Sequence, residues 1–518
     1  MLVVDAAGAR AADSAAIAAG IPSRALMQRA GAAAAAEVVR RFPGDIAAGI
    51  VVATGAGNNG GDGWVMAAAL HAAGVRVRVV ECLPARAPDA RAERAAAIAA
   101  GVPHGSDVES LLRGSERIAI DALLGTGLRA DAPLEGAAAK AVATLIARRL
   151  LDGTSIVALD VPSGMDATTG HDVGALRCAL TLAFGTLKRC HVVSRGGCGH
   201  IAVLDIGLGS HASLATTRGA TLATPQWFRR SVPPIDASAH KGTRGRIAIV
   251  GGAPGMAGAV ILAARAAVRS GAGLVKCVVS PESVQAVHEA EPAALVTPWP
   301  VDDATLGREI TEWADAVLAG PGLGRATART LVERLLRQFD GAVVLDADAL
   351  NAFAGDADRL APLLASRQAM LTPHPAELAR LLDRTVDDVL FERFTLLPSF
   401  ARRIGAVVLS KGVPTIVATP DGALTVVAEG TPILATGGSG DLLGGIAVTL
   451  LAQTGNAGLA GALAAYAHGR AAHLVSARDV RGYTLDDVLL ALPVVWSLPA
   501  PMPRPPVLAE LPAVGEPA

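Results

Sequence analysis

The chain alternates short, β-branched apolar runs with longer helical stretches, and it does so in two separate blocks. In the first block the runs include residues 50–55, 75–81, 116–125 and 155–164; in the second they include 246–252, 273–280, 316–324 and 342–351. This alternation favours a mostly parallel sheet with helices on both faces. Because 518 residues exceed what one hydrophobic core usually organises, we predict an α/β fold with two three-layer domains.

Changes in composition along the chain predict the domain boundaries. The first domain should span residues 1–208, and the Ser-, Thr- and Pro-containing segment 209–234 is typical of a linker or hairpin. The second domain should span 235–496, and the Pro-rich tail 497–518 is predicted to be disordered. The two blocks share no repeated motif, which indicates a fusion of two domains and not an internal duplication.

Composition also excludes several classes of function. About half of the residues are apolar (51%), the net charge is −1, and no basic stripe suggests nucleic-acid binding. No uninterrupted apolar run reaches the roughly 20 residues of a membrane span, and the N-terminus lacks the pattern of a secretory signal. The 5 cysteines form no C-x-x-C pair, which fits a reducing compartment. We therefore expect a cytoplasmic protein without nucleic-acid or membrane partners.

Zinc binding is an alternative for one cysteine- and histidine-containing segment. Cys190, His191, Cys198 and His200 lie close together in the sequence, but their spacing fits no standard zinc module. The intervening residues 192–197 are typical of a hairpin, which does not favour a metal site.

The stretch GAGNNGGDG, residues 55–63, lies between an apolar run and a helical stretch. Its glycines at positions 55, 57 and 60 satisfy the dinucleotide pattern G-x-G-x-x-G, and Glu81 ends the next strand, where a ribose-binding acid is expected. Asp62 argues against a simple pyrophosphate cradle, since in the first turn of the helix its charge would repel a phosphate by on the order of a few kcal/mol. Asn58 and Asn59 offer carbonyl oxygens, so we predict an oxygen-coordinated cation together with a polar ligand.

Polar side chains also follow two later strands of the first block. Asp121 ends one predicted strand, and Asp160 and Ser163 follow another. Ligands of open parallel sheets bind at the carboxyl ends of the strands, so these residues should face one crevice. For any single aspartate the alternative is a helix N-cap or a turn residue.

The motifs NNGGDG, DALLGTGL and DVPSG, in this order and spacing, resemble the epimerase domain of the NAD(P)H-hydrate repair enzymes over residues 1–208. ALMQRAG, residues 25–31, resembles the first helix of that domain, although Gln28 stands where an acid is more usual. The resemblance implies a Rossmann-like domain. Its substrate would be NADH or NADPH hydrated at C6 of the nicotinamide ring, in R and S forms.

The same resemblance implies the site residues of this domain. Asp160 would be the catalytic acid or base, because inversion of a carbinolamine carbon requires proton transfer. Lys188 is a candidate for neutralising a phosphate, with a solvated surface lysine as the alternative. A potassium ion would be bound by Asn59, Asp121 and Ser163. The hydrate would be bound by Asn58, Asn59, Gly60, Gly61, Asp62, Gly125, Thr126, Gly127, Leu128, Arg129, Ala130, Asp131 and Asp160.

The strongest motif of the second block is ATGGSGDLLGGI, residues 435–446. Its glycines precede a helix and leave main-chain N–H groups directed at a phosphate. Asp441 at the helix start is a candidate for deprotonating an attacking hydroxyl during phosphoryl transfer, and a simple N-cap is the alternative. His374 lies between two prolines, which presents it rigidly.

The motifs HKGTRG, GPGLG, LDADALN, PHPAE, KGVPT and GGSGD resemble the ribokinase-like superfamily, in particular its NAD(P)H-hydrate dehydratase branch, over residues 235–495. The resemblance implies that ADP phosphorylates the C6 hydroxyl of the S hydrate, after which phosphate leaves. Magnesium would ride on the nucleotide phosphates. The hydrate would be contacted by Ala259, Gly322, His374 and Asp441, and the nucleotide by Lys411, Gly412, Val413, Pro414, Thr415 and Gly440. Ala376 and Thr431 depart from the usual glycine and asparagine, but neither change removes a charged or reacting group.

Together the motifs predict a bifunctional repair enzyme that forms a homo-oligomer and acts on hydrated NADH or NADPH with ADP. One alternative is a ribokinase-like sugar or vitamin kinase fused to a dinucleotide-binding module. Another is a first domain that binds a ligand without catalysis. The sequence does not decide between the NADH and NADPH hydrates.

Overall fold

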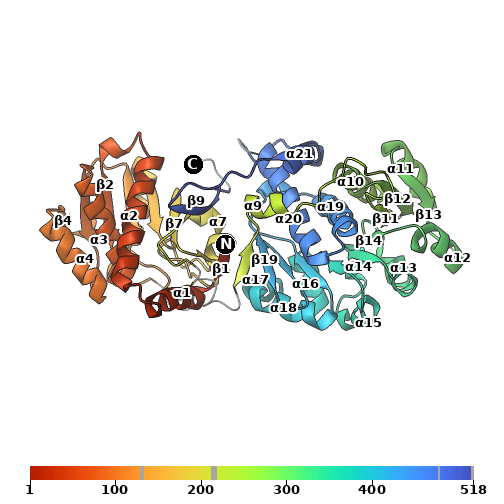
Figure 1. Ribbon diagram of the computed structural model, residues 1–518, viewed down its shortest axis with the longest axis horizontal. Coiled ribbons are helices and arrows are strands. Elements are labelled where there is room, and N and C mark those ends of the chain that lie inside the picture. The colour runs from red at the N-terminus through yellow and green to blue at the C-terminus, as the bar shows by residue number, and fades with distance from the viewer. Residues whose placement is uncertain (129–133, 210, 212–218, 301, 477–478, 515–518) are drawn as a thin grey trace. The chain divides into compact units, whose positions relative to one another are not determined.

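The structure is a computed structural model that describes the chain except residues 129–133, 210, 212–218, 301, 477–478 and 515–518. It divides into two compact units, which are described separately (Figure 1). Unit 1 comprises Met1–Thr221 and Met502–Ala518, and unit 2 comprises Leu222–Pro501.

Unit 1 is built on a sheet in which every neighbouring pair of strands is parallel except β20 with β9. In spatial order the strands are β20 (Val507–Leu511), β9 (His200–Leu204), β7 (Leu180–Phe184), β6 (Ser155–Leu159), β5 (Ile118–Ala122), β2 (Ile50–Thr54), β3 (Val77–Glu81) and β4 (His104–Gly105). The carboxyl ends of β2, β5 and β6 therefore lie along one edge of the sheet.

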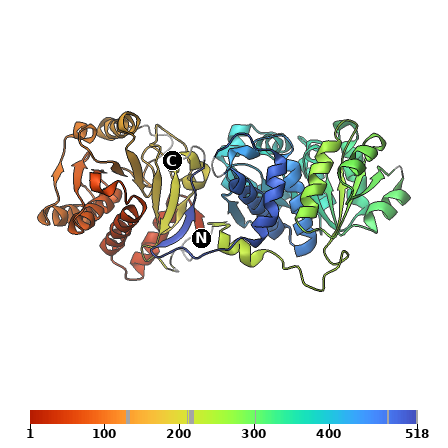
Figure 2. The same ribbon diagram turned by 90° about the horizontal axis from the view of Figure 1, so that it is seen from above.

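Side chains of the central strands alternate between two apolar layers. Ile50 and Val52 pack with helices α1 (Ala6–Ala18), α2 (Ser23–Arg41) and α3 (Asn58–Ala72), whereas Val51 and Ala53 pack with α5 (Gly136–Asp152). This period of two buries both faces of the sheet. The prediction of a three-layer α/β unit is confirmed (Figures 1 and 2). Shorter elements of this unit are η1 (Ile46–Ala48), α4 (Pro88–Ala99) and η2 (Val108–Leu112).

The tail that was predicted to be disordered contains β20, which pairs antiparallel with β9. Val507, Ala509 and Leu511 are buried and the two residues between them are exposed. This alternation is the signature of a half-buried strand, and the surrounding prolines concealed it. The predicted linker likewise contains β10 (Ala220–Leu222) and α9 (Pro225–Ser231). Thr224 caps α9 by accepting a hydrogen bond from the Trp227 N–H, and Pro225 occupies the first helical turn.

The hairpin predicted over residues 192–197 is wrong. These residues belong to two short helices, α6 (Arg189–Val193) and α7 (Arg195–Cys198), which follow β8 (Leu187–Lys188). The β-branched Val192 and Val193 favour a strand locally, but the buried His191 side chain caps α6 and fixes the helical turn. β8 pairs in parallel with β1 (Leu2–Val4), which also pairs antiparallel with β10.

Unit 2 contains a second, largely parallel sheet. Its spatial order is β13 (Leu295–Pro298), β12 (Leu274–Val279), β11 (Arg246–Val250), β14 (Ala316–Ala319), β15 (Ala342–Leu345), β16 (Ala369–Leu371), β17 (Val407–Ser410), β18 (Thr415–Ala418) and β19 (Leu424–Val427). Pairs from β13 to β17 are parallel, and the pairs β17–β18 and β18–β19 are antiparallel.

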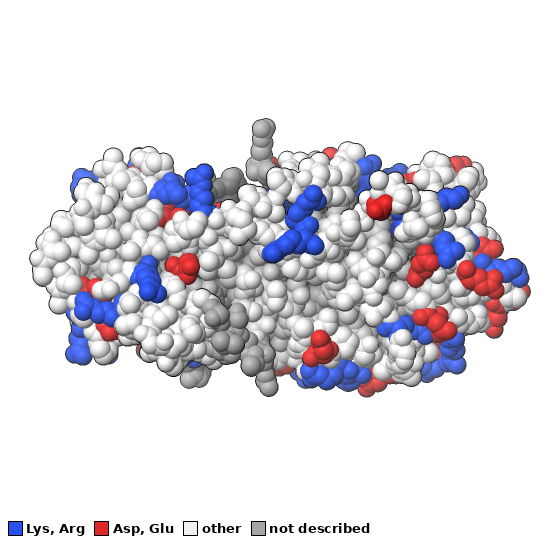
Figure 3. Space-filling model, in the orientation of Figure 1, with Lys and Arg blue, Asp and Glu red and all other residues white. Residues whose placement is uncertain are grey.

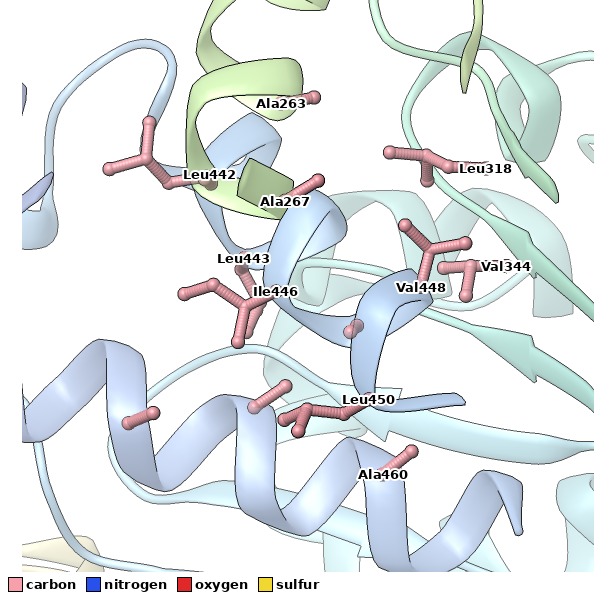
Figure 4. Packing of buried hydrophobic residues seen from close by; sticks show 14 of the residues in the cluster. Ala263, Ala267, Leu318, Val344, Leu442, Leu443, Ile446, Val448, Leu450 and Ala460 are labelled. Carbon is pink, nitrogen blue, oxygen red and sulfur yellow. The ribbon is translucent and has the colours of Figure 1, made fainter. Parts of the chain in front are cut away.

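One face of this sheet is covered by α10 (Ala257–Arg269), α19 (Ser439–Thr454), α20 (Ala457–Val475) and α21 (Leu485–Ser497). Figure 4 shows α19 at the centre of this layer, with Leu442 and Ile446 among side chains of α10, α20 and the strands. Close packing of α19 on α10 requires a glycine, since a Cβ on Gly445 would lie 2.1 Å from the carbonyl oxygen of Ala263. α19 is thereby held against the sheet edge at which β14 and β15 end.

Figure 1 shows α13 (Arg325–Gln338), α16 (Pro375–Leu382) and α18 (Arg393–Ile404) on the opposite side of the sheet. The remaining helical elements are η3 (Pro281–Ser283), α11 (Val284–Ala290), α12 (Asp303–Leu306), η4 (Gly307–Thr311), α14 (Asp348–Asn351), η5 (Ala357–Arg359), α15 (Ala361–Leu364), α17 (Val386–Phe391) and η6 (Pro432–Leu434). Within the described ranges, no helix is long and apolar enough to cross a membrane. Acidic and basic side chains are interspersed on the face shown in Figure 3.

Candidate functional sites

Unit 1 has a cavity of about 420 Å³ at the carboxyl ends of β2, β5 and β6. Predicted site residues that line it are Asn58, Asn59, Asp62, Gly125, Thr126, Gly127, Asp160 and Lys188. Arg129, Ala130 and Asp131 lie outside the described residues. Residues from three separate motifs therefore meet at one cavity.

Several glycines of the first motif are required by packing. A Cβ on Gly60 would lie 2.0 Å from the carbonyl oxygen of Gly55, and one on Gly61 would lie 2.5 Å from the sulfur of Met27. These glycines let β2, α2 and α3 approach closely, so their contact with a hydrate remains a prediction. Leu128 also does not line the cavity in the described part of the chain. Asp62 lies one turn deeper in α3 than predicted, since the helix already begins at Asn58.

Asp160 follows β6 in an unusual backbone conformation. Its φ of 63° lies in the left-handed region, which costs a non-glycine residue on the order of 1–3 kcal/mol. The carboxylate accepts hydrogen bonds from the Phe184 N–H at 3.1 Å and from the Lys188 ammonium. Its main-chain N–H donates to Leu182 at 2.8 Å. The strained turn places the Asp160 carboxylate in the cavity wall, beside the Lys188 ammonium.

Lys188 is buried, with only 2% of its surface exposed, so the alternative of a solvated lysine is wrong. Its ammonium donates to the Asp160 carboxylate and to the carbonyl oxygens of Phe184 and Thr186, at 3.0 and 3.2 Å. These acceptors match the number of N–H donors on an ammonium group. Lys188 is thus the fixed counter-ion of Asp160.

His191 connects these two residues through its ring. Its Nδ1 accepts the Lys188 N–H at 3.1 Å, and its Nε2 lies 2.7 Å from the carbonyl oxygen of Asp160. Burial, reinforced by Lys188, lowers the pKa of His191 to about 4, so the ring is neutral and Nε2 carries the proton. Both nitrogens are engaged, which argues against the zinc alternative. The sequence suggested His191 only as a possible zinc ligand. Its contacts with Lys188 and Asp160 arise from the tertiary fold.

The cavity wall carries a cluster of carboxyl groups: Asp13, Asp62 and Asp160. Burial raises the pKa of Asp62 well above its ordinary value, and the charges of Asp160 and Asp13 raise it further. Burial raises the pKa of Asp13 to about 6, although the charge of Lys188 opposes this. Burial and these charges therefore favour the neutral form of Asp62 beside the Asp160–Lys188 ion pair. Sequence reasoning missed Asp13, whose acidic side chain in an alanine-rich helix was the available signal.

The three residues predicted to bind potassium share one hydrogen-bond network. The Ser163 hydroxyl and N–H each donate to the buried Asp121 carboxylate at 2.7 Å, and the Asn59 amide donates to the carbonyl oxygen of Leu124 at 2.9 Å. The Leu124 N–H donates to Ser163 Oγ at 3.0 Å. Among the described residues, the buried Asn59 Oδ1 has no hydrogen-bond partner. Burial raises the pKa of Asp121 to about 6, against the effect of the Ser163 donors.

The second candidate site lies where β15 and β17 end in unit 2. Asp346 follows β15, and Lys411 follows β17; their Oδ1 and Nζ atoms are 2.7 Å apart. Glu377 Oε2 lies 3.8 Å from the same Nζ. Burial favours the neutral amine, but the Asp346 and Glu377 charges outweigh it and raise the pKa of Lys411. Sequence analysis did not predict Asp346 as a site residue. It follows a predicted strand directly, which is the criterion that identified Asp121 and Asp160.

Asp441 is the third residue of α19, and Gly438 occupies the cap position in the left-handed region with φ of 91°. The alternative that Asp441 is an N-cap is therefore wrong. Burial raises its pKa to about 7, as does the nearby charge of Asp346, while Lys411 has the opposite effect. A carboxylate with this pKa can accept a proton near neutral pH.

The other predicted residues of this site have defined local roles. His374 caps α16, since its Nδ1 accepts the N–H groups of Ala376 and Glu377 at 3.2 and 3.4 Å. Burial lowers the pKa of His374. Gly322 has φ of 54°, and a Cβ there would lie 3.3 Å from the Ala259 Cβ, so these two residues are brought together.

The loop predicted to bind a nucleotide comprises Lys411, Gly412, Val413, Pro414 and Thr415. Its Thr415 hydroxyl donates to the Gly412 carbonyl oxygen at 3.2 Å, and Val413 is exposed. A Cβ on Gly440 would lie 3.3 Å from the Lys411 ammonium. The first residue of the loop and the start of α19 are therefore adjacent.

Comparison with known proteins shows matches to two family models. Residues 23–190 match the model described as YjeF-related protein N-terminus, and residues 247–493 match NAD(P)H-hydrate dehydratase. A bifunctional NAD(P)H-hydrate repair enzyme from Moorella thermoacetica is 36% identical over 92% of this chain and 92% of its own. This chain belongs to the family of bifunctional NAD(P)H-hydrate repair enzymes. The Escherichia coli member is 34% identical over 90% of this chain and 88% of its own. A solved ADP/ATP-dependent NAD(P)H-hydrate dehydratase from Bacillus subtilis, co-crystallised with ATP and Mg²⁺, is 28% identical, with a TM-score of 0.48, and covers 54% of this chain and 98% of its own.

Membership in the repair-enzyme family does not favour a sugar or vitamin kinase fused to a binding module. Two residues that depart from the family motifs, Gln28 and Thr431, have hydrogen-bond partners in the structure. Gln28 donates to Glu93 Oε1 at 2.8 Å, a bond that an ionised acid at this position could not make. Thr431 Oγ1 accepts a hydrogen bond from the Ser476 hydroxyl at 2.9 Å. Both replacements are satisfied locally.

Proposed function

We propose that unit 1 interconverts the R and S hydrates of NADH and NADPH, and that unit 2 dehydrates the S form at the expense of ADP. The observation that carries this proposal is the presence of two separate buried acid–lysine constellations at strand ends. Asp160 is paired with Lys188 in one, and Asp441 lies near the Lys411–Asp346 pair in the other. Each provides the proton-transfer group that its step requires.

In the first step Asp160 would pass the proton of the C6 hydroxyl to the ring nitrogen as the bond between C6 and that nitrogen opens, which gives an aldehyde and an amine. Reclosure on the other face, with return of the proton, gives the opposite isomer. Lys188 holds the carboxylate in place, and Asp62 in the same cavity, whose raised pKa favours its neutral form, would donate a hydrogen bond to the developing carbonyl oxygen.

A potassium ion fits the network of Asn59, Asp121 and Ser163. All three offer oxygen atoms, and the unpartnered Asn59 Oδ1 is already buried. The ion would supply positive charge beside the buried Asp121 carboxylate and the phosphates of the substrate. This arrangement would offset the repulsion that the Asp121 carboxylate imposes on a phosphate.

In the second step Asp441 would remove the proton from the C6 hydroxyl of the S hydrate while that oxygen attacks the terminal phosphoryl group of ADP. The products are AMP and a phosphorylated hydrate, from which the ring nitrogen expels phosphate to leave an iminium ion. Loss of a proton from C5 then restores the dihydropyridine. Main-chain N–H groups at the start of α19 and the Lys411 ammonium would bind the phosphates.

Magnesium would be held by the nucleotide phosphates, where it neutralises their charge. Asp346 is already bonded to Lys411. The described residues contain no cluster of three or more His, Cys, Asp or Glu side chains suited to a metal. We further propose that the enzyme works in the cytoplasm as a homo-oligomer.

The test is incubation of the purified chain with a mixture of R and S hydrates, Mg²⁺ and ADP. We expect both isomers to be consumed, with recovery of the dihydropyridine absorbance and formation of AMP in equal amount. Accumulation of a stable phosphorylated product would contradict the proposal and indicate a kinase. Consumption of S alone would contradict the activity of unit 1.

A further inference from the structure

Unit 2 has a second cavity, of about 600 Å³, that none of the predicted site residues line. It lies at the C-terminal ends of α10 and α19, where Arg269 and Gln453 are among its lining residues. The opposite, N-terminal ends of the same helices carry Ala259 and Asp441 of the candidate dehydratase site. The two sites are therefore separated by the length of these helices.

The charge of this cavity is unbalanced. Arg229, Arg244 and Arg269 line it, and in the described ranges the lining contains no Asp or Glu. Within the same ranges, none of the three guanidinium groups forms an ion pair with a carboxylate. Figure 3 shows basic side chains at the position of α9, which carries Arg229, with the acidic side chains of that face lying apart from them. Three like charges around one space favour the entry of an anion.

Main-chain carbonyl groups hold two of these arginines in place. Arg244 Nε donates to the Gly271 carbonyl oxygen at 3.0 Å, and Arg229 Nη1 donates to that of Trp496 at 3.1 Å. A guanidinium has five N–H donors, so each retains donors after these bonds. Fixed guanidinium groups bind phosphate with little loss of side-chain freedom.

The cavity also has an apolar wall. Ser270 lines it and is 93% buried, but its hydroxyl oxygen has almost no accessible surface, so the arginines are the charged groups that a ligand can contact. Val232, Ile235 and Trp496 provide apolar surface in the same cavity.

We propose that this cavity binds a small organic phosphate, in which the phosphate contacts the arginines and an apolar group contacts Trp496. The competing explanation is that the arginines only compensate the partial negative charge at the ends of the helices around the cavity. That explanation predicts stabilisation of the protein without any ligand.

The test is calorimetric titration of the full chain with phenyl phosphate and a parallel titration with phenol, in which the Arg269→Gln variant distinguishes this cavity from the nucleotide site. We expect saturable binding of phenyl phosphate that weakens as salt rises, and no binding of phenol at the same concentrations. Equal affinity for phenol would overturn the proposal, as would the absence of saturable binding.

Arg269→Gln is the decisive variant, because the Arg269 side chain is exposed and its guanidinium makes no hydrogen bond or ion pair with any residue that the structure describes. Loss of one charged hydrogen-bond donor should weaken phenyl phosphate binding on the order of tenfold. The matched control is Arg402→Gln, an exposed arginine on α18, which should bind as the unaltered chain does. Unchanged binding by Arg269→Gln, with only its thermal stability lowered, would show that the arginine serves the helix end alone.

Discussion

The two candidate sites use the same residue types in different arrangements. In unit 1 the lysine bonds directly to the candidate acid, since Lys188 donates to the Asp160 carboxylate. In unit 2 the lysine bonds to another residue, Asp346, and the carboxylate of Asp441 forms no hydrogen bond or ion pair with a side chain in the part of the chain described. Asp160 is thus held as a charged pair, whereas Asp441 is left as a base with a pKa of about 7.

This difference suits the two reactions. Epimerisation returns its proton, so a fixed pair that takes and gives back one proton is sufficient. In phosphoryl transfer the attacking hydroxyl loses its proton, and a base with a pKa near 7 can remove this proton while the phosphoryl group is transferred. We therefore expect a change in one site to leave the activity of the other unaltered.

The largest effect is expected from Asp441→Asn. Loss of the base should reduce ADP-dependent consumption of the S hydrate on the order of a thousandfold, while R and S still equilibrate at the rate of the unaltered chain. The rates are measured by recovery of dihydropyridine absorbance and by chromatographic separation of the isomers. Asp340→Asn, a fully exposed aspartate in the same unit, is the control. Loss of both activities in Asp441→Asn would show that the sites are not independent.

A smaller effect is expected from pH. Asp441 acts only when deprotonated, so kcat/KM for the S hydrate should fall about tenfold per pH unit below the pKa of about 7 and level off above it. A pH series with pure S hydrate and saturating ADP measures this. A rate that stays constant from pH 8 to pH 5 would exclude Asp441 as the base.

The smallest effect is expected from the monovalent cation. Replacement of potassium by tetramethylammonium, which is too large for the network of Asn59, Asp121 and Ser163, should slow epimerisation several-fold and leave dehydration of pure S unchanged. Asn59→Ala should be slow in both salts, because it lacks the buried Oδ1. If epimerisation were indifferent to the cation, the ion would have no part in the reaction.

Sequence patterns predicted the layers of the fold and the positions of the acids at the strand ends. Both depend on the order of residues within a short segment. The apolar runs specify two buried faces, because successive side chains of a strand point to opposite faces. Acids that follow parallel strands lie at the same edge of the sheet, independently of the loop conformation. Asp121, Ser163 and Asn59 therefore meet as expected.

Features that depend on long-range contacts were not predictable. The roles of Lys188 and His191 come from their burial against Asp160, which is distant in the sequence. The tail strand β20 exists because β9 offers a free edge, and a Pro-rich composition gives no sign of that edge. Glycines of the first motif similarly proved to be packing positions as well as candidate ligand contacts.

The most direct test of two independent acids is a time course of Asp160→Asn with mixed hydrates, Mg²⁺ and ADP. We expect S to disappear as fast as with the unaltered chain, while R remains and declines only at its spontaneous rate of conversion. Consumption of R at the unaltered rate would show that Asp160 does not carry the first reaction.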